Sequence, residues 1–196
     1  ALSSEELVGI AEARSATSAD VMVGFNRRFA PLVGRIEEHF SGRTHPLAMT
    51  YRVNAGFIPH DHWVHDPVEG GGRILGEVCH FLDLLQHLAG ARPVRVSAAS
   101  IAGDTRYRSD DNIAATICFA DGSVGVILYT ALGDQRLAKE YLEVFGEGRV
   151  AILTDFRTLE LTARGRTKRT RSANQDKGFQ EEIRRFLTAV REGGPM

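Results

Sequence analysis

Apolar residues recur at helical spacing in three segments of the chain, at about 27–40, 74–88 and 179–190. Intervals of three and four positions place such residues on one face of a helix, as in helices that pack on a core. The last segment, with Phe179, Ile183 and Leu187 on one stripe, is therefore expected to pack on a sheet. A fourth, capped helix is expected from Ser3 onward, because two serines precede Glu6 and an apolar run.

Short runs of β-branched and aromatic residues fill most of the remaining chain and predict strands. The predicted strands lie near 47–54, 93–101, 112–119, 123–131, 140–146, 149–153 and 157–162. The pair Asp121-Gly122 between two of these runs is a strong hairpin signal, since glycine adopts the positive φ that tight hairpin turns require. Residues 164–171 alternate basic side chains with threonine, which suits an exposed edge strand. Together these runs predict a mostly antiparallel meander.

The first 25 residues are expected to form a separate unit. The helix from Ser3 is followed by the apolar run 20–25, which is typical of a buried strand in a parallel sheet. No predicted strand precedes this run, so it would lack neighbours within the chain. We therefore expect residues 1–25 and 26–196 to belong to different domains.

Composition and charge narrow the class of protein. With 196 residues, 43% of them hydrophobic and 25% charged, the chain is long enough for one sizeable core. A formal net charge of -1 with scattered signs makes nucleic acid and membranes unexpected partners. No apolar run approaches the roughly 20 residues of a membrane helix, and Ala1 to Glu6 has no signal region. Cys79 and Cys118 lie within apolar runs, like reduced thiols, so a cytoplasmic protein is expected.

The helix expected at 74–88 carries an ionisable face. At about 100° per residue, one sector of it holds Glu77, His80, Asp83 and His87. A histidine with a pKa near 6.5 gives or takes a proton at neutral pH, and a carboxylate one turn away can orient its ring. The alternative is the solvated face of an ordinary amphipathic helix. The glycine run 70–72 favours a functional face, because it allows close backbone approach at the start of the helix.

The irregular segment 58–69 holds two prolines, three histidines and the only tryptophan. His60, His62 and His65 offer metal-ligand atoms, so a metal-dependent enzyme is one alternative, although their spacing matches no strong metal motif and no metal is expected. In the other hypothesis these polar groups hydrogen-bond a polyhydroxylated substrate while Trp63 stacks on its ring. The following glycines lack the GxGxxG spacing and a preceding strand, which argues against a dinucleotide loop.

Three motifs follow one another along the chain. They are Val21-Met-Val-Gly-Phe-Asn-Arg-Arg-Phe-Ala-Pro31, Gly70-Gly-Gly-Arg-Ile-Leu-Gly-Glu-Val-Cys-His-Phe-Leu-Asp83 and Phe119-Ala-Asp-Gly-Ser123. In this order they resemble the glucose-fructose oxidoreductase/inositol dehydrogenase/MocA family, in which a Rossmann domain binds NAD(P) and a C-terminal domain supplies the substrate pocket. The resemblance implies an α+β fold with an open, mostly antiparallel, mixed β-sheet and helices on one face. This is the C-terminal domain fold of glyceraldehyde-3-phosphate-dehydrogenase-like/dihydrodipicolinate-reductase-like two-domain enzymes.

The resemblance also implies roles for individual residues. His80 corresponds to the family histidine that acts with a lysine of the Rossmann domain in moving the hydroxyl proton. Asn26 is implied to contact the cofactor, and the substrate-binding positions are Arg28, Asn54, His62, Trp63, His65, Glu77 and Asp83. A structural role for Asp83 is equally open. Gly76 stands where the family often has an aspartate, and Glu77 is the candidate substitute.

Residues 1–25 then resemble the tail of a Rossmann domain, and residues 26–196 resemble the substrate-binding and oligomerisation domain. The predicted protein is an NAD(P)-dependent oxidoreductase of a sugar, inositol or nucleotide-sugar type substrate, and this chain alone is expected to be inactive and to hold neither NAD nor NADP. The Gly-Glu-Val-Cys-His variant is similar to a subgroup fused behind a zinc-dependent, alcohol-dehydrogenase-like half. The competing hypothesis is a non-catalytic binding or dimerisation module, a homo-oligomer formed through the open sheet.

Overall fold

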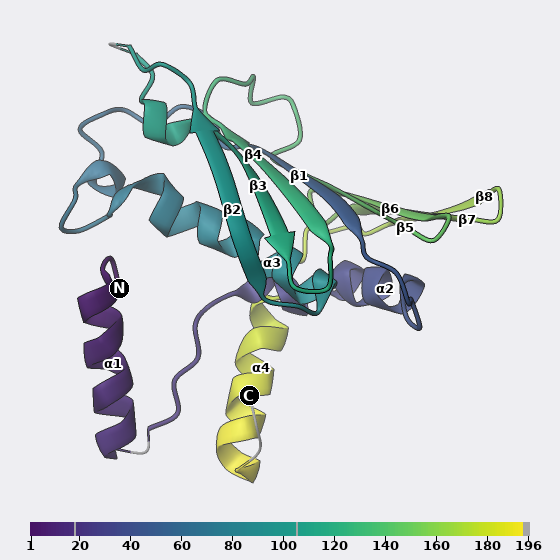
Figure 1. Cartoon of the computed structure of the whole chain (residues 1–196), viewed down its shortest axis with the longest axis horizontal. Helices are drawn as coiled ribbons and strands as arrows, with labels where there is room; N and C mark the ends of the chain where they lie inside the picture. The colour runs from purple at the N-terminus through teal and green to yellow at the C-terminus, as the bar shows by residue number, and fades with distance from the viewer. Residues whose placement is uncertain (18, 105, 194–196) are drawn as a thin grey trace.

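The runs of strand-forming residues build one eight-stranded sheet with the order β2-β3-β4-β1-β5-β6-β7-β8. The computed structural model describes residues 1–17, 19–104 and 106–193 (Figure 1). The strands are β1 (Ala48–Asn54), β2 (Pro93–Ser100), β3 (Ile113–Phe119), β4 (Val124–Thr130), β5 (Glu140–Gly146), β6 (Arg149–Thr154), β7 (Thr158–Ala163) and β8 (Arg166–Arg171). The predicted strands from 47 onward are thus confirmed.

The sheet is mixed because β1 separates two antiparallel meanders. Strands β2–β4 form one meander and β5–β8 form the other, while β1 lies between them, parallel to β4 and antiparallel to β5. The Asp121-Gly122 turn joins β3 to β4, with Gly122 at φ 87°. The implied fold class, an open and mostly antiparallel mixed sheet, is confirmed.

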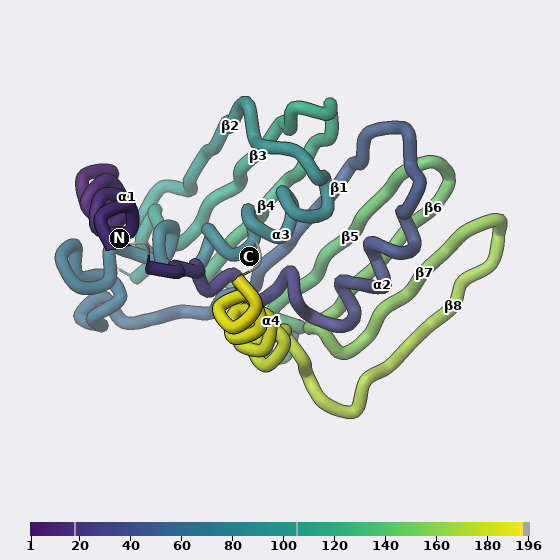
Figure 2. The backbone as a smooth tube through the Cα atoms, turned by 90° about the horizontal axis from the view of Figure 1, so that it is seen from below, coloured from purple at the N-terminus to yellow at the C-terminus, as the bar shows by residue number. Residues whose placement is uncertain are grey.

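Two helices cover one face of this sheet and leave the other face bare. Figure 2 shows α2 (Pro31–His39) and α3 (Cys79–Ala89) lying across the strands on the same side. Alternate residues of the strands point toward these helices and form the core together with helix residues. Its most buried members include Tyr51, Leu142 and Leu153 of the strands and Phe81 and Leu84 of α3. On the opposite face apolar residues such as Val124, Leu128 and Phe145 stay exposed.

The helix predicted over 27–40 is split in two. A 3₁₀ turn, η1 (Asn26–Phe29), precedes α2, and Ala30 between them is extended at φ -66° and ψ 134°. Pro31 causes the break, because the residue before a proline disfavours the α conformation and proline suits the first turn of a helix. The break gives η1 its own orientation on the surface of α3.

The helix predicted over 74–88 also differs in its first turn. Ile74–Val78 forms a π-helical turn, η3, and only Cys79–Ala89 is α-helical. The wider turn breaks the α-helical wheel, so Ile74 is exposed although the α-helical spacing places it on the apolar face. The glycine run before it is required sterically: a Cβ on Gly70 would lie 2.4 Å from the carbonyl oxygen of Val64.

Two expectations for the ends of the chain are wrong. The run 20–25 is not a strand, and Val21 and Val23 are exposed because no neighbouring strand pairs with it in the described residues. The helix α4 (Phe179–Glu192) contacts η1 rather than the sheet, and its apolar stripe faces solvent. The helix α1 (Ser4–Thr17) buries no residue. Figure 1 shows α1 and α4 projecting from the same side of the sheet. No helix in the described part of the chain is long and apolar enough to cross a membrane.

Candidate functional site

His80 lies in the first turn of α3, half-buried behind the segment that leads into η1. The ring of Phe25 meets the imidazole edge-on, with 5.6 Å between ring centroids. Burial, and secondarily the positive charge of Arg27, lowers the pKa of His80 below its usual value. Its Nδ1 is buried and has no hydrogen-bond partner among the residues that the structure describes. The imidazole is therefore neutral at pH 7, which suits proton exchange with a bound hydroxyl.

Asp83, one turn after His80, is paired with Arg28. The Arg28 Nε donates to Asp83 Oδ2 at 2.9 Å, and a second guanidinium nitrogen contacts Oδ1. Asp83 is only 6% exposed, so this pair fastens η1 to α3. Arg28 and Asp83 were both predicted to bind substrate, and in the structure they form an ion pair with each other.

Glu77 occupies the π-helical turn and receives three groups on one oxygen. The Tyr129 hydroxyl donates to Glu77 Oε2 at 2.7 Å, while Lys139 Nζ lies 3.7 Å and Arg73 Nη2 lies 3.8 Å from it. Burial, followed by the hydrogen bond to Glu77, raises the pKa of Tyr129 well above its usual value. Glu77 precedes His80 by three residues, and the hydrogen bond from Tyr129 of β4 orients its carboxylate.

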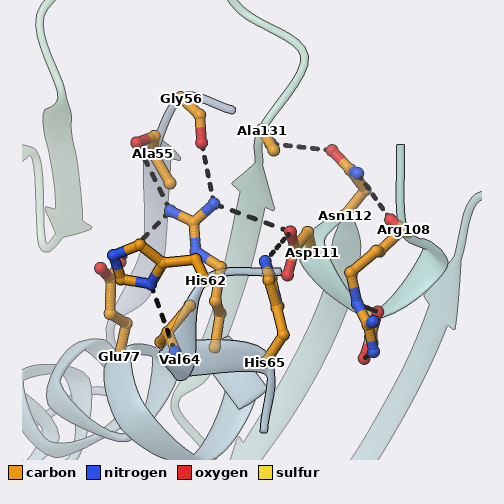
Figure 3. Close-up of polar contacts among 12 residues, drawn as sticks. Ala55, Gly56, His62, Val64, His65, Glu77, Arg108, Asp111, Asn112 and Ala131 are labelled. Carbon is orange, nitrogen blue, oxygen red and sulfur yellow. Dashed lines mark hydrogen bonds and ion pairs between the residues drawn. The ribbon is translucent and has the colours of Figure 1, made fainter. Parts of the chain in front are cut away.

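Arg73 joins the segment that follows β1 to this turn. Its guanidinium donates to the carbonyl oxygens of Gly56 and Ala55 at 2.8 and 3.4 Å, and both of these residues are labelled in Figure 3. The guanidinium also stacks over the Tyr129 ring at 5.1 Å. Asp111, in the 3₁₀ turn η4 (Ser109–Asp111), approaches from the next loop, with Oδ2 3.9 Å from Arg73 Nη1. The arginine is 1% exposed, so it forms a buried link between three loops at one end of the sheet.

His65 completes this buried group from the turn η2 (Trp63–His65). Its Nε2 lies 3.6 Å from Asp111 Oδ2, beyond hydrogen-bond distance. Both ring nitrogens of His65, Asp111 Oδ1 and Arg73 Nε lack hydrogen-bond partners within the described residues. Burial raises the pKa of Asp111, although His65 and Arg73 oppose this shift. The group is polar, enclosed and only loosely paired.

A second buried network lies beneath η1. Arg27 donates to both oxygens of Glu140 at 2.8 and 3.0 Å, and the carboxylate also accepts from Tyr51 and Lys177, each at 2.6 Å. Burial alone would raise the pKa of Glu140, but Arg27 and Lys177 outweigh it and lower the pKa to about 2. The network ties η1 to β1, β5 and the segment before α4, and so positions the neighbours of His80.

The amides of two predicted pocket residues are used within the fold. Asn26, the implied cofactor contact, is buried and donates to the carbonyl oxygen of Lys177 at 2.8 Å. Asn54 donates to the carbonyl oxygens of Asp134 and Leu137 at 2.7 and 3.3 Å, holding the loop between β4 and β5. If Asn26 and Asn54 contact a ligand as predicted, they must do so through atoms other than the amide hydrogens that they donate within the fold.

The three histidines of the irregular segment 58–69 point to different partners. His60 Nε2 lies 3.0 Å from the carbonyl oxygen of Arg106, His62 Nδ1 accepts from the Val64 amide at 3.2 Å, and His65 is buried beside Asp111. No group of three histidine, cysteine or acidic residues in the described ranges is arranged to hold a metal ion. Trp63 is 60% exposed, next to His62, and is available for stacking.

The sequence motifs missed the residues that surround the ionisable helix from other elements. No local motif marks these residues, which lie 31 or more positions from His80 on other strands and turns: Asp111, Tyr129, Lys139 and Glu140. Glu140, a carboxylate opening an apolar strand, was the clearest available signal. Arg73 stood within the recognised glycine motif, where its burial could not be foreseen.

The sequence model described as GFO/IDH/MocA C-terminal domain matches residues 33–151. The chain belongs to this family. Among solved structures, UDP-N-acetylglucosamine 3-dehydrogenase GnnA from Acidithiobacillus ferrooxidans is 24% identical with a TM-score of 0.79, and the match covers 100% of this chain and 60% of that one. Levoglucosan dehydrogenase, solved with NADH and levoglucosan, is 22% identical with a TM-score of 0.78, covering 100% and 64%.

A further solved structure shows the same extent of similarity. An oxidoreductase domain protein from Kribbella flavida is 18% identical with a TM-score of 0.74, and the match covers 97% of this chain and 62% of that one. The comparison with curated proteins returned no match. This GFO/IDH/MocA chain therefore spans about three-fifths of the solved proteins that it resembles.

Proposed function

We propose that this chain is the substrate-binding part of an NAD(P)-dependent oxidoreductase, with His80 as general acid/base. The observation that carries the proposal is the half-buried, neutral His80 in the first turn of α3, flanked by Glu77 and the Asp83–Arg28 pair. A neutral imidazole can accept the hydroxyl proton of an alcohol substrate, and acceptance of the hydride is the chemistry that a bound nicotinamide would supply. The chain itself would bind the substrate, orient it and move this proton.

The exposed apolar residues at the ends of the chain support a dinucleotide-binding domain next to His80. Val21 and Val23 on the run before η1, and Phe179 and Ile183 on α4, present apolar surface to solvent. Exposed apolar surface of this extent commonly marks an interface. In the proposed enzyme, residues 1–25 belong to that domain and residues 26–196 to the substrate domain. Inactivity of the chain alone follows from this proposal.

The proposed substrate is a sugar, an inositol or a nucleotide sugar. Trp63 offers an exposed indole beside His62 at the loop end of the sheet, a combination of stacking surface and polar groups that suits a polyhydroxylated ring. The names of the two solved dehydrogenases, which refer to a nucleotide sugar and to levoglucosan, agree with this class. As part of the same proposal, Glu77 takes the place of the aspartate that the family often has at the position of Gly76.

The proposal is tested by His80→Ala in the full-length enzyme. Loss of the general acid/base should lower kcat by about 10²-fold or more. His87→Ala is the matched control, because His87 lies on the same helix, 3.0 Å from Glu37, and away from the first turn. Near-normal turnover of the His80 variant would refute the assigned role, and so would an equal loss in both variants.

We also propose that the bare face of the sheet pairs with a second copy of the chain. Apolar residues on β4 and β5 stay uncovered there, including Leu128 and Phe145. Phe145→Glu should shift a dimer to monomer in sedimentation velocity, whereas Leu132→Glu, at an exposed apolar residue of the loop after β4, should leave it unchanged. A strict monomer of the unaltered chain at high concentration would exclude this pairing.

The Gly-Glu-Val-Cys-His variant supports a finer proposal, fusion behind a zinc-dependent, alcohol-dehydrogenase-like half. Zinc analysis of the full-length protein tests it, with a stoichiometric ion expected. A zinc-free full-length enzyme with normal turnover would exclude the fusion and leave the role of His80 intact.

A further inference from the structure

We infer that the turn between β6 and β7, together with the edge strand β8, forms a binding groove for a phosphate group. The groove measures ≈ 540 Å³ and is lined by Thr154, Asp155, Arg157, Thr158, Arg169 and Arg171. It lies on the β7–β8 side of the sheet, the edge opposite β2 (Figure 2). The loops that carry Trp63 and Arg73 take no part in it.

Strand register places the groove residues on one face. Thr154 pairs with Thr158, and Thr158 pairs with Arg171, so these three side chains form a row across β6, β7 and β8. Arg169 belongs to the adjacent row of the same face. This is the face opposite the helices, because the intervening Leu153 and Leu159 point into the core. Two hydroxyls and two guanidiniums therefore project in one direction.

Arg157 is presented by a turn that is held rigidly. Asp155 and Phe156 both have positive φ, 49° and 53°, a conformation that side-chain-bearing residues adopt at a cost. The Asp155 carboxylate accepts from the backbone amides of Glu140 and Lys139 at 2.8 and 3.2 Å. Phe156 is buried, and Gln175 donates to the Asp155 carbonyl oxygen at 2.8 Å. These contacts over-determine the turn, so the backbone that carries Arg157 needs little ordering before a ligand binds.

The charge of the groove is incompletely balanced. Among the described residues, neither Arg157 nor Arg171 has a carboxylate within ion-pair distance, and Arg169 pairs only with the partly buried Glu160 at 3.2 Å. The one acidic residue of the lining, Asp155, uses both oxygens on backbone amides. Guanidinium forks match the oxygen spacing of phosphate, and threonine hydroxyls donate to the same oxygens. A phosphate-bearing small molecule is the ligand that this donor set fits.

The need to keep the exposed edge strand β8 from pairing with another strand does not explain why Arg157, Arg169 and Arg171 share one groove. Basic residues on β8 discourage pairing with another strand, and Arg166 and Lys168 already serve that purpose. Arg157 is not on β8, and edge protection does not require it to share a groove with Arg169 and Arg171. The exposed apolar residues proposed for pairing, such as Leu128 on β4 and Phe145 on β5, lie on the same face of the sheet but on other strands than the groove, which is lined from β6, β7 and β8.

The test is a titration of inorganic phosphate into the isotope-labelled chain at constant ionic strength, followed through the backbone amide chemical shifts. We expect saturable shifts centred on residues 154–158 and 169–171. Arg157→Ala/Arg171→Ala should weaken binding by about tenfold or more, since it removes two guanidiniums that donate charge-assisted hydrogen bonds to the phosphate oxygens. Pyrophosphate, with more oxygens for the same guanidiniums, should bind more tightly than phosphate.

Arg164→Ala/Arg166→Ala is the matched control. It removes the same charge from the opposite end of the β7–β8 hairpin and should retain the affinity of the unaltered chain. Non-saturating shifts, or equal weakening in both double variants, would show non-specific attraction and overturn the inference. The amide spectrum of each free variant verifies its fold. None of these outcomes depends on His80, so the proposed function stands or falls separately.

Discussion

The two buried polar groups beside the ionisable helix differ in how completely their carboxylates are satisfied. Glu140 accepts from Arg27, Tyr51 and Lys177 at 2.6–3.0 Å. Asp111 has its nearest cationic groups at 3.6 and 3.9 Å and one oxygen without a partner among the described residues. The first group ties four parts of the fold together. The second leaves polar atoms of His65, Arg73 and Asp111 without hydrogen-bond partners among the described residues.

The largest expected effect is that of breaking the tight group. Glu140→Ala leaves Arg27 and Lys177 without their shared carboxylate, and removal of one partner from a buried ion pair costs about 3–5 kcal/mol. Urea unfolding monitored by circular dichroism measures this loss in free energy of unfolding. Glu181→Ala, which removes the exposed partner of Arg184 and Arg185, is the control and should change the unfolding midpoint little. Comparable midpoints for the two variants would contradict the role assigned to Glu140.

The pH dependence of stability should reveal the same group. The folded-state pKa of Glu140 lies at about 2, below its usual 4.5, so its contribution is present above pH 4.5 and lost as pH falls toward 2. Urea unfolding of the unaltered chain and of Glu140→Gln between pH 6 and 2 measures it. The difference in free energy of unfolding between the two should shrink over that interval. A constant difference would show that the ionised carboxylate is not what Arg27 and Lys177 require.

The loose group should give the smallest effect, with the opposite sign. Burial raises the folded-state pKa of Asp111, so its ionised form opposes folding at neutral pH, and stability gains as pH falls through the folded pKa. Asp111→Asn removes that charge and should leave the free energy of unfolding at pH 7 unchanged or slightly higher. The same urea experiment tests it. A loss as large as that of Glu140→Ala would erase the distinction between the two groups.

The strands could be predicted because each carries its own signal. Alternation of apolar residues and the Asp121-Gly122 turn identify β3 and β4 without any knowledge of their neighbours. The helix α4 was predicted equally well, but its packing was not, because an apolar stripe does not say which surface covers it. The run 20–25 failed for a related reason: its strand-like composition needs a neighbouring strand that the described chain does not supply.

The candidate site was predictable only along one helix. Glu77, His80 and Asp83 share a local spacing, and the glycine run marks where their helix begins. Glu140 is separated from Arg27 by 113 residues and from Lys177 by 37, so the network forms only when the sheet assembles. The break at Ala30 did have a local signal in Pro31. Sequence patterns thus located the histidine, and the tertiary fold determined its electrostatic surroundings.

The π-helical turn at Ile74–Val78 has a consequence for how this protein can vary. A π turn holds one more residue than the α-helical turn that it replaces. Deletion of a single residue there would convert it to an α-helical turn and leave the residues on either side near their present angular positions, because the wider turn itself accommodates the extra residue. Arg73, just before the turn, would then keep its partners at Ala55 and Gly56. Related sequences that keep this loop arrangement should therefore place a one-residue gap at this turn rather than within α3, where a gap would rotate the preceding residues by about 100°.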